Sequence, residues 1–146
     1  VALFALQFAR LLGAHVTVIS SSDEKIERLA AMGADATVNY NRTPDWARAT
    51  REITGGRGYD QIVEVGGEKT LPQSLRCVRP GGTISMIGVL SGAAMQASLG
   101  HVVTRQVRLQ GVTVGKERMT VKLGLATRAA PPRPAPPSKS PPPAKP

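Results

Sequence analysis

The chain has 146 residues, a formal net charge of +9 and only 3% aromatic residues. This length allows one domain with its own core, built mainly from Val, Ile, Leu and Ala because aromatic side chains are few. The single cysteine, Cys77, excludes an internal disulfide and a cysteine-rich metal site. No apolar run reaches the roughly 18 to 20 residues that span a bilayer. We therefore expect a soluble, cytoplasmic protein without a membrane partner.

The apolar residues from Val1 to Leu12 repeat at helical spacing and end at Gly13. Because apolar residues lie on both the one side and the opposite side of this helix, it is predicted to be buried nearly all round. Nothing before Val1 caps its first four N–H groups. We therefore expect that the start of the domain lies upstream of Val1.

A strand, a helix and a second strand follow between His15 and Tyr40. Residues 16–19 are short, apolar and β-branched, as in a strand that is buried on both faces. Ser21 followed by Glu24 predicts a capping box, and Gly33 is typical of the residue that ends a helix. Such a βαβ unit predicts a parallel sheet with a right-handed crossover.

The same alternation continues along the chain. Helices are predicted from Thr43-Pro44-Asp45 to about Thr54, over 69–78 and within 97–106, and strands over 60–65, 83–89 and 108–114, with 80–82 as a turn. Short connections between alternating strands and helices favour a doubly wound parallel α/β sheet.

The composition changes at Thr120. The last 27 residues hold five basic residues and no acidic one, and nine of the twelve prolines lie between Pro131 and Pro146. Such a segment cannot bury apolar surface, so residues 1–119 are predicted to fold and residues 120–146 to be a disordered basic tail. Thinly spread charges without aromatic residues bind nucleic acid weakly, so nucleic acid is not an expected partner.

Several of these segments resemble one known family. Residues 1–10, 20–25, 33–40, 79–82 and 105–115 resemble the medium-chain dehydrogenase/reductases, most closely the zinc-type alcohol dehydrogenases and their quinone oxidoreductase relatives. The resemblance extends to about Met119. It implies a two-domain enzyme whose other, preceding domain carries the catalytic zinc ligands and the pocket for a small-molecule substrate.

The resemblance also places the first Rossmann strand and the first glycines of the phosphate-binding turn before Val1. The expected protein is therefore the cofactor-binding portion of an NAD(P)-dependent oxidoreductase that acts on alcohols, aldehydes or quinones. Its Rossmann-like sheet would lack the first strand, and the chain alone would be truncated and inactive, with zinc only in the missing domain. A truncated gene or a frameshift near Thr120 would explain the tail.

Two other readings of the chain stay open. The first is a non-catalytic remnant or interaction protein whose basic proline-rich tail engages acidic partners, nucleic acid or an SH3-like domain. The second is a chain that does not fold stably alone, because a sheet without its central strand exposes unpaired edges. In the resembling family the last strand often pairs across a dimer, so residues 108–114 are the expected edge of a homodimer.

The candidate cofactor-binding residues begin at the end of the first predicted strand. Ser20, Ser21 and Ser22 can donate to a 2′-phosphate without repelling it, and Lys25 can add a charge-assisted contact. The resemblance adds Tyr40, because a lysine and a tyrosine at these two positions help to hold the phosphate of NADPH. These residues favour NADP. If Asp23 turned toward the ribose, NAD would be favoured instead, and the plainer alternative is a helix cap with a solvated lysine.

A second group of candidates follows later strands. Gly66, Gly67, Gly88, Val89 and Leu90 lie at carboxyl ends of strands, where open α/β sheets bind ligands. They are predicted to line the dinucleotide groove, with simple turn chemistry as the alternative. Val114 and Gly115, at the end of the last strand, are weaker candidates for the nicotinamide end.

No catalytic or metal-binding residue is predicted in this chain. His15 and His101 have no second metal ligand at a useful spacing, and Cys77 is expected to pack in the core. Glu64 is expected to be a partner at the end of a strand instead of a general base.

Overall fold

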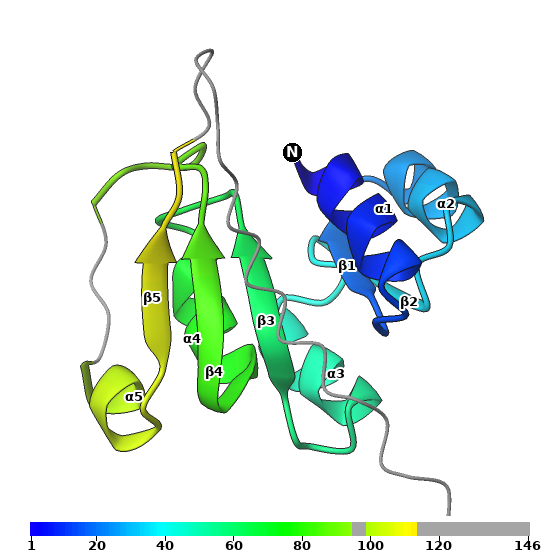
Figure 1. Ribbon diagram of the computed structural model, residues 1–146. Helices are drawn as coiled ribbons and strands as arrows, with labels where there is room; N and C mark the ends of the chain where they lie inside the picture. Colours follow the sequence, from blue (N-terminus) through cyan, green and yellow to red (C-terminus); the bar gives the residue numbers. More distant parts are fainter. Residues whose placement is uncertain (95–98, 114–146) are drawn as a thin grey trace, which may run out of the picture.

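The computed structural model describes residues 1–94 and 99–113, in which helices and parallel strands alternate along the chain (Figure 1). This alternation confirms the predicted doubly wound α/β class. The elements are α1 (Ala2–Leu11), β1 (Thr17–Ser20), α2 (Asp23–Ala31), β2 (Ala36–Asn39), α3 (Trp46–Ile53), β3 (Tyr59–Glu64), α4 (Leu71–Cys77), β4 (Val78–Met86), α5 (Leu99–Thr104) and β5 (Arg108–Gly111). None of the helices described is long and apolar enough to cross a membrane.

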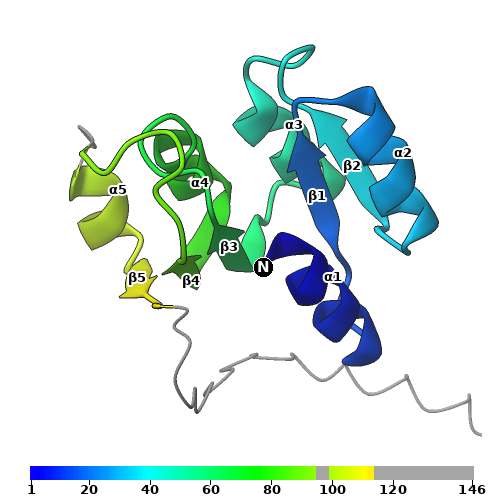
Figure 2. The same ribbon diagram turned by 90° about the horizontal axis from the view of Figure 1, so that it is seen from above.

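The strands form two parallel sheets. One contains β1 and β2, and the other has the order β3-β4-β5. In Figure 1 the strands β3 to β5 run side by side, whereas the perpendicular view of Figure 2 shows them foreshortened and β1 and β2 extended. The two sheets therefore run in different directions. The division falls between β1 and β3, which is the position of the first strand in the order 3-2-1-4-5-6 of a complete dinucleotide-binding sheet.

Helix α3 packs across this division. Its Trp46 and Ala47 are buried together with Cys77 at the end of α4. Around these three residues lie side chains from both sheets: Ile19, Val38, Tyr40, Tyr59 and Ile62. Because apolar burial is the main favourable term in folding, this cluster is the principal connection between the sheets.

A half-buried tyrosine connects the two sheets across the same division by hydrogen bonding. The Tyr59 hydroxyl on β3 lies 2.9 Å from Oγ1 of Thr17 on β1 and 3.0 Å from the carbonyl oxygen of Thr50 on α3. A phenol carries one hydrogen, so it can donate to the carbonyl while it accepts from the Thr17 hydroxyl. Burial raises the pKa of Tyr59, which keeps the phenol neutral.

The second sheet has a core of its own beneath α4. Leu71 and Leu75 of α4 pack on Val78 and Ile84 of β4, and Val107 closes the cluster before β5. Val78 and Ile84 are completely buried. The core therefore rests on aliphatic side chains, as the composition predicts.

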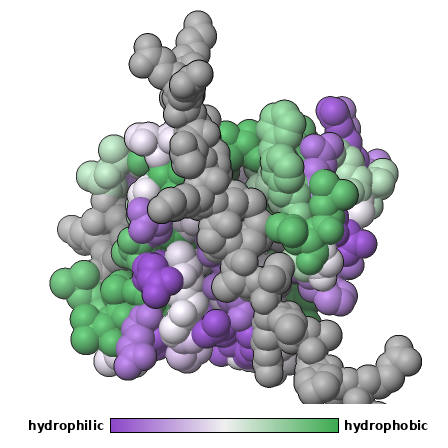
Figure 3. Space-filling model, in the orientation of Figure 1, coloured by the Kyte–Doolittle hydropathy of each residue, from purple (hydrophilic) through white to green (hydrophobic). Residues whose placement is uncertain are grey.

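Helix α1 differs from its prediction. Leu6 is buried, but Phe4 is 66% exposed, Phe8 51% and Leu11 82%, so the expectation of a helix buried nearly all round is wrong for this structure. Apolar side chains gather on the right of Figure 3, where α1 lies. Among the described residues, too few side chains reach α1 to cover its whole apolar surface.

Two helix starts also differ from the predictions. The Ser22 side chain caps α2 by accepting from the Lys25 N–H at 3.4 Å, so the predicted Ser21–Glu24 capping box is wrong. Helix α3 begins after Asp45 instead of after Thr43. There the N–H groups of residues 42 and 43 both donate to the Asn39 carbonyl, which holds a turn just after β2.

Strand β4 begins earlier than predicted. It starts at Val78 and includes residues 80–82, which were expected to form a turn. Val78 pairs with Tyr59, and the next pair is Thr83 with Gln61. The pairing is therefore interrupted by an irregular segment, which accommodates Pro80 because proline has no N–H to donate to a ladder.

Asp35 attaches α1 to the first sheet. Its carboxylate accepts from the Val16 N–H at 2.7 Å and from Nη1 of Arg10 at 2.9 Å. The Val16 hydrogen bond is the largest influence on the pKa of Asp35 and lowers it, whereas burial opposes this less strongly; the charges of Arg10 and His15 lower the pKa further. The ionised carboxylate therefore favours the folded chain.

We expect Tyr59→Phe to reduce the free energy of unfolding by about 1 to 2 kcal/mol, because Thr17 and the Thr50 carbonyl lose their shared partner. Urea denaturation of the full chain measures the change. Tyr40→Phe is the matched control, since its hydroxyl makes no hydrogen bond within the described residues. Equal effects of the two substitutions would contradict a bridging role for Tyr59.

We expect Asp35→Asn to destabilise the chain at pH 7 by about 1 to 2 kcal/mol. Because the folded-state pKa of Asp35 is lowered, its contribution is complete above the ordinary aspartate pKa of about 3.9 and is lost as the pH falls through the folded-state value. Urea denaturation of both proteins between pH 3 and 7 measures this. The difference should shrink at the acidic end, and a constant difference would count against the assignment.

Candidate functional site

The turn between β1 and α2 presents three serines at the carboxyl end of a strand. The Ser20 Oγ accepts from the Ser22 N–H at 3.3 Å, and the Ser22 Oγ accepts from the Lys25 N–H. Both side chains use a lone pair to shape the turn, so each hydroxyl hydrogen can still be donated to an anion. Ser21 and Lys25 are exposed beside them.

The loop after β2 lies against this turn. The Asn41 side-chain amide donates to the Ser21 carbonyl at 3.1 Å. Asp23 accepts from the Asn39 amide at 2.7 Å and forms an ion pair with Arg42. Asp23 therefore already has two partners, and its pairing brings the Arg42 guanidinium to the serine turn.

Three of these residues were missed in the sequence: Asn39, Asn41 and Arg42. The available signal was their position directly after β2, since carboxyl ends of neighbouring parallel strands meet at one edge. Tyr40 was predicted there, and its N–H donates to the Ser20 carbonyl at 3.0 Å. Its half-buried ring packs against the Trp46 cluster, so much of the side chain belongs to the core.

The second group of predicted residues forms two loops that are joined to each other. The Ser91 N–H donates to the Gly66 carbonyl at 2.7 Å, and the Glu68 N–H donates to the Gly92 carbonyl at 3.2 Å. Gly67 has a φ of +90°, and a Cβ there would lie 2.6 Å from the Gly92 oxygen. The close approach of these two loops therefore requires glycine at 67.

Gly88, Val89 and Leu90 continue the second of these loops. A Cβ on Gly88 would lie 2.5 Å from the Val65 oxygen, whereas Val89 and Leu90 are 54% and 86% exposed. Gly88 is therefore required by the close approach of the Val65 backbone. The exposed side chains of Val89 and Leu90 lie beyond the carboxyl end of β4.

Glu64 organises the loop after β3 from inside the protein. It is only 5% exposed. Its Oε1 accepts from the Gly66 N–H and the Thr70 hydroxyl, both at 2.7 Å, and from the Gly67 N–H at 3.3 Å, while Oε2 accepts from the Ser74 hydroxyl at 2.6 Å. This geometry confirms the prediction of an end-of-strand partner. The amides of Gly66 and Gly67 are already used by this carboxylate.

The structure thus places the predicted residues in two groups. One surrounds the serine turn, and the other occupies the loops after β3 and β4. No hydrogen bond within residues 1–94 and 99–113 joins the two groups, and the sheets that carry them run in different directions. Val114 and Gly115 lie outside the described residues.

Cys77, His15 and His101 are the remaining residues whose side chains could act in catalysis or bind a metal. The Cys77 thiol is buried 3.1 Å from the Thr50 hydroxyl, and burial raises its pKa, as expected for a packing residue. His15 lies 3.6 Å from Asp35, and His101 is in α5. In the part of the chain that the structure describes, no three His, Cys, Asp or Glu side chains come together as metal ligands.

Parallel strands, alternating helices and polar residues at the carboxyl ends of strands define a dinucleotide-binding type of α/β domain. The chain belongs to the zinc-binding dehydrogenase family, which matches residues 1–128, and so to the medium-chain dehydrogenase/reductases. The match reaches beyond Met119, where the resemblance in the sequence was expected to end.

Known proteins agree with this membership. A zinc-type alcohol dehydrogenase-like protein of Schizosaccharomyces pombe is 46% identical over 123 residues, which are 82% of this chain and 36% of that protein. A solved structure from Sinorhizobium meliloti, named an alcohol dehydrogenase, is 44% identical with a TM-score of 0.72, over 78% of this chain and 33% of the other. An NAD-dependent alcohol dehydrogenase structure is 37% identical, also with a TM-score of 0.72, over 76% and 32%. The chain therefore spans about a third of the length of these relatives.

We expect Glu64→Ala to destabilise the chain by about 3 kcal/mol or more, because four donors at a buried site lose their acceptor. Glu64→Gln should cost less, since an amide oxygen can replace Oε1 and the Ser74 hydroxyl can accept from the amide nitrogen. Thermal and urea denaturation measure both variants. Glu27→Ala, on the exposed side of α2, is the control, and an equally small effect of Glu64→Ala would contradict the organising role.

Proposed function

We propose that this chain is the cofactor-binding portion of an NAD(P)-dependent oxidoreductase that acts on alcohols, aldehydes or quinones. The observation that carries this proposal is the cluster of hydroxyl and cationic groups at the carboxyl ends of β1 and β2, in a chain that belongs to a dehydrogenase family. The zinc ligands and the substrate pocket would lie in the two thirds of the protein that correspond to the rest of its relatives.

The serine turn fits the phosphorylated ribose of NADP. In this fold an acidic residue at the end of the second Rossmann strand accepts the ribose hydroxyls of NAD, and an arginine nearby accommodates the 2′-phosphate of NADP. Here Ser20 ends the strand, and the Arg42 guanidinium lies at the turn. Lys25 supplies a second, exposed cation within one helical turn.

Asp23 is the residue that would favour NAD instead. Its carboxylate accepts from Asn39 and is paired with Arg42, so a ribose would share this carboxylate with two partners that are already in place. One similar structure is an NAD-dependent alcohol dehydrogenase. In this chain, the choice between NAD and NADP depends on whether Asp23 or Arg42 contacts the ribose of the bound cofactor. A 2′-phosphate would keep Arg42 in place as a cation and would be repelled by Asp23 if Arg42 were removed.

Adenosine 2′,5′-bisphosphate and adenosine 5′-diphosphate test this proposal with the full chain, because they carry similar charge and only the first has the 2′-phosphate. We expect the first to bind about tenfold more tightly by isothermal titration calorimetry, as a charge-assisted hydrogen bond would provide. Arg42→Gln should remove this preference, because it also releases Asp23.

Arg28→Gln is the control for the loss of one positive charge, since Arg28 is exposed near the far end of α2. If the two adenosine nucleotides bind equally well, or if Arg28→Gln and Arg42→Gln act alike, the NADP assignment of this turn is wrong. Binding of the 5′-diphosphate in preference to the bisphosphate would favour NAD.

A further inference from the structure

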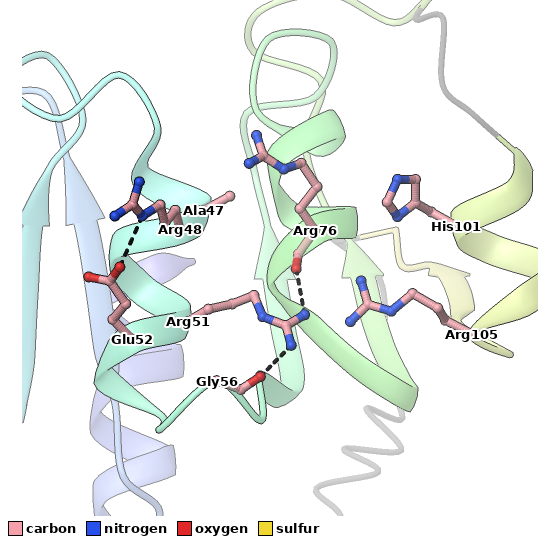
Figure 4. A pocket seen from close by; sticks show the side chains of 8 residues that line it. All are labelled: Ala47, Arg48, Arg51, Glu52, Gly56, Arg76, His101 and Arg105. Atoms are coloured by element: carbon pink, nitrogen blue, oxygen red, sulfur yellow. Dashed lines mark hydrogen bonds and ion pairs between the residues drawn. The ribbon is translucent and has the colours of Figure 1, made fainter.

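A cavity of about 450 Å³ opens between α3, α4 and α5, at the end of the second sheet where β3, β4 and β5 begin. The candidate cofactor residues lie at the opposite, carboxyl ends of strands. Figure 4 shows the side chains that line this cavity, which we term the basic pocket: Ala47, Arg48, Arg51, Glu52, Gly56, Arg76, His101 and Arg105. Four arginines and one glutamate give its lining a net positive charge.

Two of the four arginines are neutralised in part by carboxylates. Nε of Arg48 lies 3.0 Å from Glu52, and Nη2 of Arg76 lies 2.9 Å from Asp45. Arg51 and Arg105 have no carboxylate partner among the described residues. The uncompensated charge of the basic pocket is therefore concentrated on these two guanidinium groups.

Backbone carbonyls hold Arg51 and Arg105 in place. Arg51 donates to the carbonyls of Arg76 and Gly56, and Arg105 donates to those of Leu75 and Val78 at 3.1 and 2.6 Å. The carbonyls of Leu75 and Arg76 belong to the last turn of α4, where helix carbonyls lack intrahelical partners, and Val78 follows directly after it. Each guanidinium has five N–H groups, so donors remain for a ligand, and their positions are already ordered before it binds.

The two guanidinium groups also disfavour each other. Burial lowers the pKa of Arg105, and the nearby positive charge of Arg51 lowers it further. Two cations thus share a partly desolvated pocket with no acid between them. A multiply charged anion would offset this repulsion and replace the water lost from the guanidinium groups.

We propose that the basic pocket binds a small molecule through a phosphate or pyrophosphate group. The planar N–H fork of arginine matches phosphate oxygens, which favours this anion over a single halide. The cavity volume lies in the range of small-molecule sites, which is larger than one phosphate needs. Exposed His101 and Arg76 at its edge can contact the remainder of such a molecule.

Inorganic pyrophosphate is the probe for a first test on the full chain, by isothermal titration calorimetry at constant ionic strength. We expect a dissociation constant below about 1 mM. The decisive variant is Glu52→Gln, which removes the only acid of the lining and releases Arg48, so binding should tighten about fivefold. Glu27→Gln, an equal change of net charge on α2, should leave the affinity unchanged.

The opposite change tests the same site. Arg76→Gln removes a cation and frees Asp45, so it should weaken pyrophosphate binding about fivefold or more, whereas Arg28→Gln should not. Both Glu52 and Arg76 are exposed and hold no backbone carbonyl by their side chains, and circular dichroism confirms that the variants are folded. Absence of pyrophosphate binding, or equal effects of each variant and its control, would overturn the proposal.

The test also separates this site from the serine turn. Arg42→Gln should change binding of adenosine 2′,5′-bisphosphate without altering pyrophosphate binding at the basic pocket. If Arg42→Gln abolishes pyrophosphate binding while Glu52→Gln and Arg76→Gln have no effect, the anion binds at the serine turn and the basic pocket is structural only.

Discussion

The structure depends on the packing of α3 across two sheets that share no hydrogen-bonded ladder within the described residues. In a continuous Rossmann sheet, a further strand between β1 and β3 would join both of them by backbone hydrogen bonds. Here Trp46 and its neighbours bury apolar surface from both sheets, and Tyr59 connects β3 to Thr17 and to α3. Side chains therefore provide the connection that a backbone ladder provides elsewhere in the fold.

This division affects the candidate cofactor site. The serine turn and Arg42 belong to the first sheet, whereas the glycine loops and Glu64 belong to the second. Within each group, hydrogen bonds link the polar residues to one another. No buried side-chain nitrogen or oxygen atom of the described residues lacks a hydrogen bond. Within residues 1–94 and 99–113, the edges of β1 and β3 that face the division have no paired strand, which is unfavourable for strands left open to solvent.

The second sheet has chemically different ends. At the carboxyl ends of its strands, the Glu64 carboxylate collects N–H and hydroxyl donors from the following loop. At the amino ends, Arg51 and Arg105 donate to carbonyls that end α4. Both arrangements satisfy backbone groups that a helix or turn leaves without partners, one with an anion and the other with cations. The two differ in accessibility, because the Glu64 carboxylate is only 5% exposed whereas Arg51 and Arg105 line an open pocket.

Elements whose signals are local could be predicted from the order of residues alone. Apolar β-branched runs gave the strands, Gly13 and Gly33 ended helices with positive φ angles, and the alternation of elements gave the α/β class. The resemblance carried by residues such as the serine turn gave the family. The shift of the α2 cap from Ser21 to Ser22 shows that boundaries remained less certain, because neighbouring serines can serve equally well.

Contacts between residues that are distant in the chain became apparent only in the folded protein. Arg42 reaches the serine turn because it pairs with Asp23 at the start of α2, which also accepts from Asn39 at the end of β2. The basic pocket combines residues from three helices. The exposure of α1 likewise became apparent only in the fold, since periodicity shows that a helix has apolar sides but not whether another segment covers them. Charge pairing and burial depend on distances between segments that are far apart in the chain, and no local pattern of residues contains those distances.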